Sequence, residues 1–213
     1  MPIERASRPL TPEPRLWRWA WGLTALTVGW NALEALVAIV SGLVAGSIAL
    51  VGFGLDSVVE VSSALVIGWR LARQSADPAA NQRAERRAVR LIALTFFVIA
   101  AYVTYEALGK LLGWAEAPDY SPVGLALVAL SLGVMPALAW AKHRVAAGLG
   151  SVALQADAAE TQLCTYLSAV VLVGLAANGL FGWWWMDPLA GLVVAAVALR
   201  EVHAAWTSGA HCC

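Results

Sequence analysis

Six long apolar stretches constrain the fold of this 213-residue chain more than any other feature. A transmembrane helix needs about 20 mostly apolar residues. Only 13% of the residues are charged, whereas soluble domains carry roughly a quarter. We therefore predict an all-α membrane protein, a six-transmembrane-helix bundle over residues 19–206, with a tail at residues 1–18 and a short tail at residues 207–213. The predicted spans are residues 19–43, 47–69, 89–112, 122–141, 152–177 and 188–206.

The distribution of basic residues predicts the orientation of this bundle. Lys and Arg concentrate in the cytoplasmic loops of membrane proteins. With the N-terminus inside, 13 of the 14 Lys and Arg residues fall on the cytoplasmic side, Lys142 among them in a loop, and only Lys110 falls outside. Both the N- and the C-terminus are therefore expected to be cytoplasmic.

Two local patterns predict where helices begin and where the chain is solvated. Polar and charged residues with an Asp-Pro step make residues 70–90 a predicted loop. Asp187 followed by Pro188 predicts an N-cap with proline in the first helical position, at the start of the sixth span.

Charge and cysteine content exclude several classes of partner and protein. The 14 basic residues balance 14 acidic residues, and the arginines near residue 85 are not interleaved with aromatic side chains. Nucleic acid is therefore not an expected partner. Three cysteines, two of them adjacent, cannot form the disulfide framework of a small secreted protein.

Acidic residues occur inside the predicted spans, where burying a charge is costly. Ionisable residues at such positions are functional hypotheses by default. No Lys or Arg is predicted deep in a span, so their counter-charge is expected from protons or from a bound cation. The acidic residues are Glu34, Asp56, Glu60, Glu106, Asp157 and Glu160.

Two of the spans carry candidate ligands four residues apart. Asp56 and Glu60 share one face of the second span, and Glu160 and Cys164 share one face of the fifth. A rise of about 1.5 Å per residue puts Asp56 level with Cys164 and Glu60 level with Glu160. If the two spans pack together, three carboxylates and a thiolate converge near the midplane and form a plausible site for a divalent transition metal.

A structural role is the alternative for these acids. Intramembrane carboxylates can accept hydrogen bonds from serines and thereby fix helix packing. Glu34 and Glu106, nearer the outer ends of their spans, favour such a structural or interfacial role. Serines that could serve as donors are Ser57, Ser62 and Ser63.

Other candidate metal-binding residues also have open alternatives. Cys164 by itself is equally typical of a small buried hydrophobe. Asp157 could be an accessory ligand on the path from the cytoplasm, a proton acceptor or a helix N-terminal cap. At the chain end, His211, Cys212 and Cys213 could capture a cytosolic metal ion or form a frayed terminus.

Four short motifs stand in a defined order along the chain. They are residues 46–50 (GSIAL), the pair Asp56 and Glu60, residues 156–164 with Asp157, Glu160 and Cys164, and residues 185–190 (WMDPLA). Together they resemble the cation diffusion facilitator family over residues 19–206. The resemblance implies export of a divalent metal, usually zinc, in exchange for protons. The metal is then the substrate, no cofactor is needed, and Asp56, Glu60, Glu160 and Cys164 are the ligands.

The chain departs from that family at two ligand positions and at its end. Glu160 and Cys164 stand where the family typically has His and Asp, which leaves the metal open among Zn, Mn, Fe, Co, Ni and Cd. Because the sequence stops at Cys213, we expect the variant without a cytoplasmic C-terminal domain. The expected location is the inner (plasma) membrane of a bacterium, and a homodimer formed through the membrane helices is an open alternative.

Two rival functions remain beside the exporter. The first is a structural or regulatory membrane subunit whose acids only fix helix packing. The second is an intramembrane hydrolase or redox protein, which is disfavoured because all three histidines lie in loops or at the interface and make no Ser-His or Cys-His set. We therefore expect a transporter rather than an enzyme.

Overall fold

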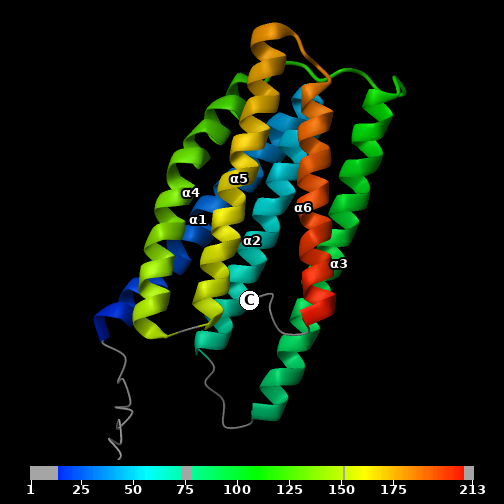
Figure 1. The fold of residues 1–213 in the computed structure, drawn as a ribbon. Coiled ribbons are helices and arrows are strands. Elements are labelled where there is room, and N and C mark those ends of the chain that lie inside the picture. Colours follow the sequence, from blue (N-terminus) through cyan, green and yellow to red (C-terminus); the bar gives the residue numbers. More distant parts are fainter. Residues whose placement is uncertain (1–13, 73–77, 151, 209–213) are drawn as a thin grey trace, which may run out of the picture.

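The computed structural model describes residues 14–72, 78–150 and 152–208, and these ranges are helical with short connections and no strand. The helices alternate in direction along the bundle (Figure 1). Their bounds are α1 Pro14–Ala45, α2 Ile48–Ala72, α3 Pro78–Leu111, α4 Pro122–Leu149, α5 Val152–Phe181 and α6 Met186–Ser208.

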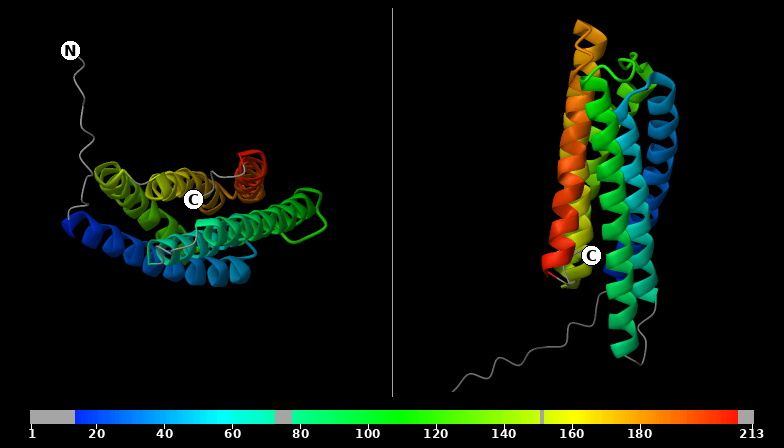
Figure 2. Two further views of the ribbon diagram at one scale, coloured as in Figure 1. Left: turned by 90° about the horizontal axis from the view of Figure 1, so that it is seen from below. Right: turned by 90° about the vertical axis from the view of Figure 1, so that its right-hand side faces the viewer.

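The helices form two rows of three, seen along their axes in Figure 2. One row is α1, α2 and α3, and the other is α4, α5 and α6, so that α1 packs on α4, α2 on α5 and α3 on α6. The first residue of α1 and the last of α6 lie at the same end of the bundle, as six alternating helices require (Figure 1). That this end is cytoplasmic stays a prediction.

The helix lengths and compositions agree with a membrane bundle. Five of the described helices, α1 to α5, are long and apolar enough to cross a membrane. The remaining helix, α6, carries Asp187, Arg200 and Glu201 and is not among the five. It nevertheless lies alongside the others over most of their length (Figure 1). The all-α membrane fold predicted from the sequence is confirmed.

Most helices extend beyond their predicted ends, and α3 and α4 do so by the most residues. The loop prediction for residues 70–90 is wrong over residues 70–72 and 78–90, because α2 continues to Ala72 and α3 begins at Pro78. The rest of that loop, residues 73–77, lies outside the described residues. Proline suits the first helical position, and the Ala, Gln, Arg and Glu residues that follow have high helix propensity. At its other end, α4 continues past residue 141 to Leu149 and stops at Gly150, whose φ of 60° provides a left-handed C-cap. As a result, Lys142 lies within a helix.

Glycines bring α1 and α2 into close contact. A Cβ on Gly42 would lie 2.9 Å from the backbone nitrogen of Val51, and one on Gly54 would lie 3.0 Å from that of Ile39. Larger side chains at these two positions would push the helices apart. The close approach of the two helices also brings the polar residues of α1 near those of α2.

Candidate functional site

Reciprocal hydrogen bonds join α2 to α5 at the level of their acidic residues. Ser63 of α2 donates to Glu160 Oε2 of α5 over 2.9 Å. In return, Thr161 of α5 donates to Glu60 Oε1 of α2 over 2.8 Å. Each helix thus supplies the hydroxyl that holds the other helix's carboxylate. The register predicted from the helical rise, with Glu60 level with Glu160, is confirmed.

The other two predicted ligands lie one turn away in the same region. Asp56 is half-buried and interacts electrostatically with Glu60, while Cys164 is buried and interacts with both Glu60 and Asp56. Within the described residues, no three His, Cys, Asp or Glu side chains are gathered closely enough to hold a metal ion. The structure therefore brings the predicted residues to one interface without a preassembled coordination shell, and their role as ligands stays a prediction.

A buried lysine corrects the expectation that no basic residue neutralises these acids. Lys142 of α4 is only 1% exposed and forms a 2.9 Å ion pair with Asp157 of α5, which is 2% exposed. Its ammonium also donates to Thr161 Oγ1 over 2.9 Å. This contact was not predicted, because the predicted fourth span ends at residue 141 and Lys142 lies one residue beyond it. Part of the counter-charge is therefore supplied by the protein itself.

The position of Asp157 in its helix excludes one of its three alternatives, the N-terminal cap, while the accessory ligand and the proton acceptor stay predictions. This residue lies in the second turn of α5, which begins at Val152. It is therefore not an N-cap residue. One of its carboxylate oxygens pairs with Lys142, while the other, Oδ1, is buried without a hydrogen-bond partner in the described structure.

Glu34 of α1 connects three helices. Its carboxylate accepts hydrogen bonds from Ser57 of α2, over 2.9 Å, and from Ser131 of α4. The side chain is fully buried, and it lies level with Asp56 because Ser57 is the next residue of α2. An isolated serine in the apolar α4 sequence was the only signal of this contact available beforehand.

A polar stripe on α1 faces the acids of α2. Thr27 and Asn31 are fully buried and lie one turn apart. Asn31 is close enough to interact with Glu60. Among the described side chains, Thr27 Oγ1, both amide atoms of Asn31 and Glu60 Oε2 are buried without a hydrogen bond of standard geometry. These atoms make the interior beside Glu60 polar rather than apolar.

Asp187 ties the sixth helix to the second rather than capping its own helix. The helix α6 begins at Met186, two residues before Pro188, where the prediction placed its first residue, so Asp187 lies inside the helix. The buried carboxylate of Asp187 accepts hydrogen bonds from the hydroxyl of Ser47 and from the backbone nitrogen of Ile48, the latter over 3.0 Å. It thereby satisfies amides in the first turn of α2. Two of the sequence motifs, GSIAL and WMDPLA, thus meet at the predicted outer end of the bundle.

Glu106, with its expected structural or interfacial role, is half-buried. Of the histidines expected in loops or at the interface, His143 is half-buried and lies inside α4, and His203 is exposed. The candidate tail ligands His211, Cys212 and Cys213 lie outside the described residues.

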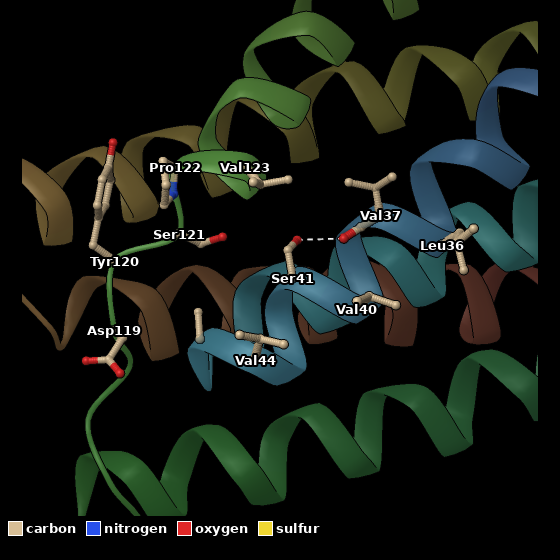
Figure 3. A pocket seen from close by; sticks show the side chains of 11 residues that line it. Leu36, Val37, Val40, Ser41, Val44, Asp119, Tyr120, Ser121, Pro122 and Val123 are labelled. Carbon is tan, nitrogen blue, oxygen red and sulfur yellow. Dashed lines mark hydrogen bonds between the residues drawn. The ribbon is translucent and has the colours of Figure 1, made fainter.

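An apolar pocket of about 740 Å³ opens between α1 and the segment that leads into α4 (Figure 3). Leu36, Val40 and Val44 of α1 form one wall, and Tyr120 and Val123 lie opposite. It does not include any of the predicted ligands, and its apolar walls do not suit a metal ion.

The fold and the buried polar interface together define a helical integral membrane protein with acidic side chains between its central helices. Residues 25–207 match the family described as the cation efflux transmembrane domain. The chain belongs to this family, which confirms the resemblance to cation diffusion facilitators seen in the sequence.

Two curated relatives support the same assignment. An uncharacterised transporter of the cyanobacterium Synechocystis is 31% identical over 156 residues, which cover 71% of this chain and 50% of the relative. An uncharacterised transporter of Methanocaldococcus jannaschii is 29% identical over 175 residues, which cover 80% of this chain and 61% of the relative. The aligned parts therefore span about half to three fifths of the relatives' own length.

Proposed function

We propose that this protein exports a divalent transition-metal ion, zinc or a zinc-like ion, in exchange for protons. The observation that carries the proposal is the reciprocal pair of hydrogen bonds across α2 and α5. These bonds hold Glu60 and Glu160 at one level of a membrane interior. In this proposal the metal is the substrate, no cofactor takes part, and the protein is a transporter rather than an enzyme.

The proposed ligands are Asp56, Glu60, Glu160 and Cys164. Carboxylates and thiolates must be deprotonated to ligate a metal, so binding the ion displaces protons and protonation favours its release. Asp56 and Glu160 are half-buried, whereas Glu60 and Cys164 are buried. The set therefore has two members accessible to an incoming ion and two in the interior, and it assembles around the ion when the helices shift.

The donor set suits zinc or cadmium better than magnesium. Thiolate favours soft and borderline ions, while three carboxylates also tolerate manganese. A four-coordinate set of this kind is compatible with tetrahedral zinc. Because Glu160 and Cys164 differ from the usual residues of the family, the preferred ion is a matter for measurement.

The first experiment measures metal-driven proton flux in liposomes. Full-length protein is reconstituted with a pH-sensitive dye inside, and ZnCl₂ is added outside. We expect zinc-dependent proton movement with the natural protein and none with Asp56→Asn, because the amide keeps the shape of the side chain without its anionic charge. The matched control is Asp119→Asn, in the exposed α3–α4 loop, which should transport normally.

The same assay tests the structural alternative. Glu34 accepts hydrogen bonds from two serines, as an acid with a purely structural role would. If all the acids act in this way, the natural protein carries no metal-dependent proton flux with Zn, Cd, Mn, Fe, Co or Ni. That result would overturn the proposed function. Location in a bacterial inner (plasma) membrane and dimerisation through the helices belong to the same proposal and need separate tests.

A further inference from the structure

We infer that Lys142 is a built-in cation that competes with the transported metal for the acids between α2 and α5, and so sets the affinity of the site. The inference rests on the proposed function and names a residue outside the predicted ligand set. It starts from the position of the Lys142 ammonium beside the candidate ligands.

The ammonium reaches the ligand region by two routes. Directly, Nζ lies 2.9 Å from Asp157 Oδ2. Through the hydroxyl of Thr161, it is linked to Glu60 by bonds of 2.9 and 2.8 Å, which limit the Nζ–Oε1 separation to 5.7 Å. The charge of Lys142 therefore acts on Glu60 as well as on its partner Asp157.

Burial strengthens this interaction. Lys142 is 1% exposed, and charges in a protein interior are screened much less than charges in water. Among the side chains whose burial the structure describes, the only other buried basic one is that of Lys110, which donates to the backbone oxygen of Glu116 over 2.7 Å near the opposite end of the bundle. The acids of α2 and α5 thus have one buried ammonium close by.

A metal ion at Glu60 would lie within a few ångströms of this ammonium. Two positive charges at that separation repel each other. The net affinity of the ion is therefore the attraction of its ligands less this repulsion. In the metal-free protein the same ammonium offsets part of the negative charge and stabilises the empty site. Lys142 therefore lowers metal affinity and makes release easier.

The test measures Zn²⁺ binding to the purified full-length protein in detergent by isothermal titration calorimetry, with thermal unfolding recorded for each variant. Lys142→Gln should bind Zn²⁺ about tenfold or more tightly than the natural protein, since the repulsion is lost. Lys142→Arg keeps the charge and should bind within a few-fold of it. The matched control, Lys110→Gln, removes the other buried lysine and should leave Zn²⁺ affinity unchanged.

A second pair of variants keeps the test valid if Lys142→Gln does not fold. Asp157→Asn releases the ammonium toward Glu60 and should weaken Zn²⁺ binding by about tenfold. The double variant Asp157→Asn/Lys142→Gln also lacks the ammonium, so neither charge of the Lys142–Asp157 ion pair remains, and it should bind Zn²⁺ tightly again. A Zn²⁺ affinity of the double variant equal to that of Asp157→Asn would overturn the inference.

The outcomes separate this inference from the proposed function. If the natural protein binds none of Zn²⁺, Cd²⁺, Mn²⁺, Fe²⁺, Co²⁺ and Ni²⁺, the proposed function fails and the inference fails with it. If the natural protein binds Zn²⁺ and the Lys142 variants change only the unfolding temperature, Lys142 is purely structural and the inference alone fails. A change in Zn²⁺ affinity with the predicted signs supports both.

Discussion

Replacing Ser63 by alanine tests whether the hydrogen bonds between α2 and α5 position a metal site. Ser63 is 3% exposed, and its hydroxyl donates to the carboxylate of Glu160 over 2.9 Å. Alanine removes this donor while retaining helix propensity. The carboxylate of Glu160 is then no longer held in one orientation by a hydrogen bond from α2.

The size of the effect follows from the chemistry of that bond. A hydrogen bond to a charged group contributes about 1.5–3 kcal/mol. At about 1.4 kcal/mol per tenfold change, the loss corresponds to roughly 10- to 150-fold in Zn²⁺ affinity if Glu160 is a ligand. This range overlaps the roughly 10- to 100-fold losses typical when a group that orients a metal ligand is removed.

The adjacent residue provides a matched control. Ser62 is exposed, and its hydroxyl donates to the backbone oxygen of Val58 in its own helix over 2.9 Å. Ser62→Ala therefore makes the same chemical change one residue away without touching α5. Zn²⁺ affinity and transport should be close to natural in Ser62→Ala and reduced in Ser63→Ala, with membrane insertion verified for both. Equal Zn²⁺ affinities in the two variants would refute the reasoning.

Two further predictions address residues at other levels of the bundle. Cys164→Asp exchanges a soft donor for a hard one, so Cd²⁺ uptake into liposomes should fall relative to Mn²⁺ uptake; an unchanged ratio in the folded variant would remove Cys164 from the ligand set. Asp187→Ala leaves the first turn of α2 without its acceptor, so the free energy of unfolding in detergent should drop by about 2–3 kcal/mol. Asp119→Ala, at an exposed site, is the control for that measurement, and an equal loss there would argue against the cap.

The number of helices and the register of two of them could be predicted from the sequence. Apolar length decides which segments cross a membrane, because lipid cannot satisfy backbone groups. The rise per residue then placed Glu60 level with Glu160, and the hydrogen bonds across α2 and α5 agree. Both inferences use local periodicity, which a single sequence contains in full.

Helix ends were less predictable, because hydropathy does not register polar helical turns. Residues 78–90 are too polar for a membrane span but have the propensity to continue α3. The same error at the end of α4 left Lys142 in a predicted loop and concealed the buried charge of the site.

Only the tertiary structure decided which helices face one another and therefore which polar side chains pair. Lys142 meets Asp157 because α4 packs on α5, and Glu34 meets Ser131, 97 residues further along the chain, because α1 packs on α4. Asp187 is in contact with the start of α2 although its sequence pattern is typical of a cap for α6. Helical periodicity specifies which residues share a face, but the neighbour of that face is chosen by packing of the whole bundle.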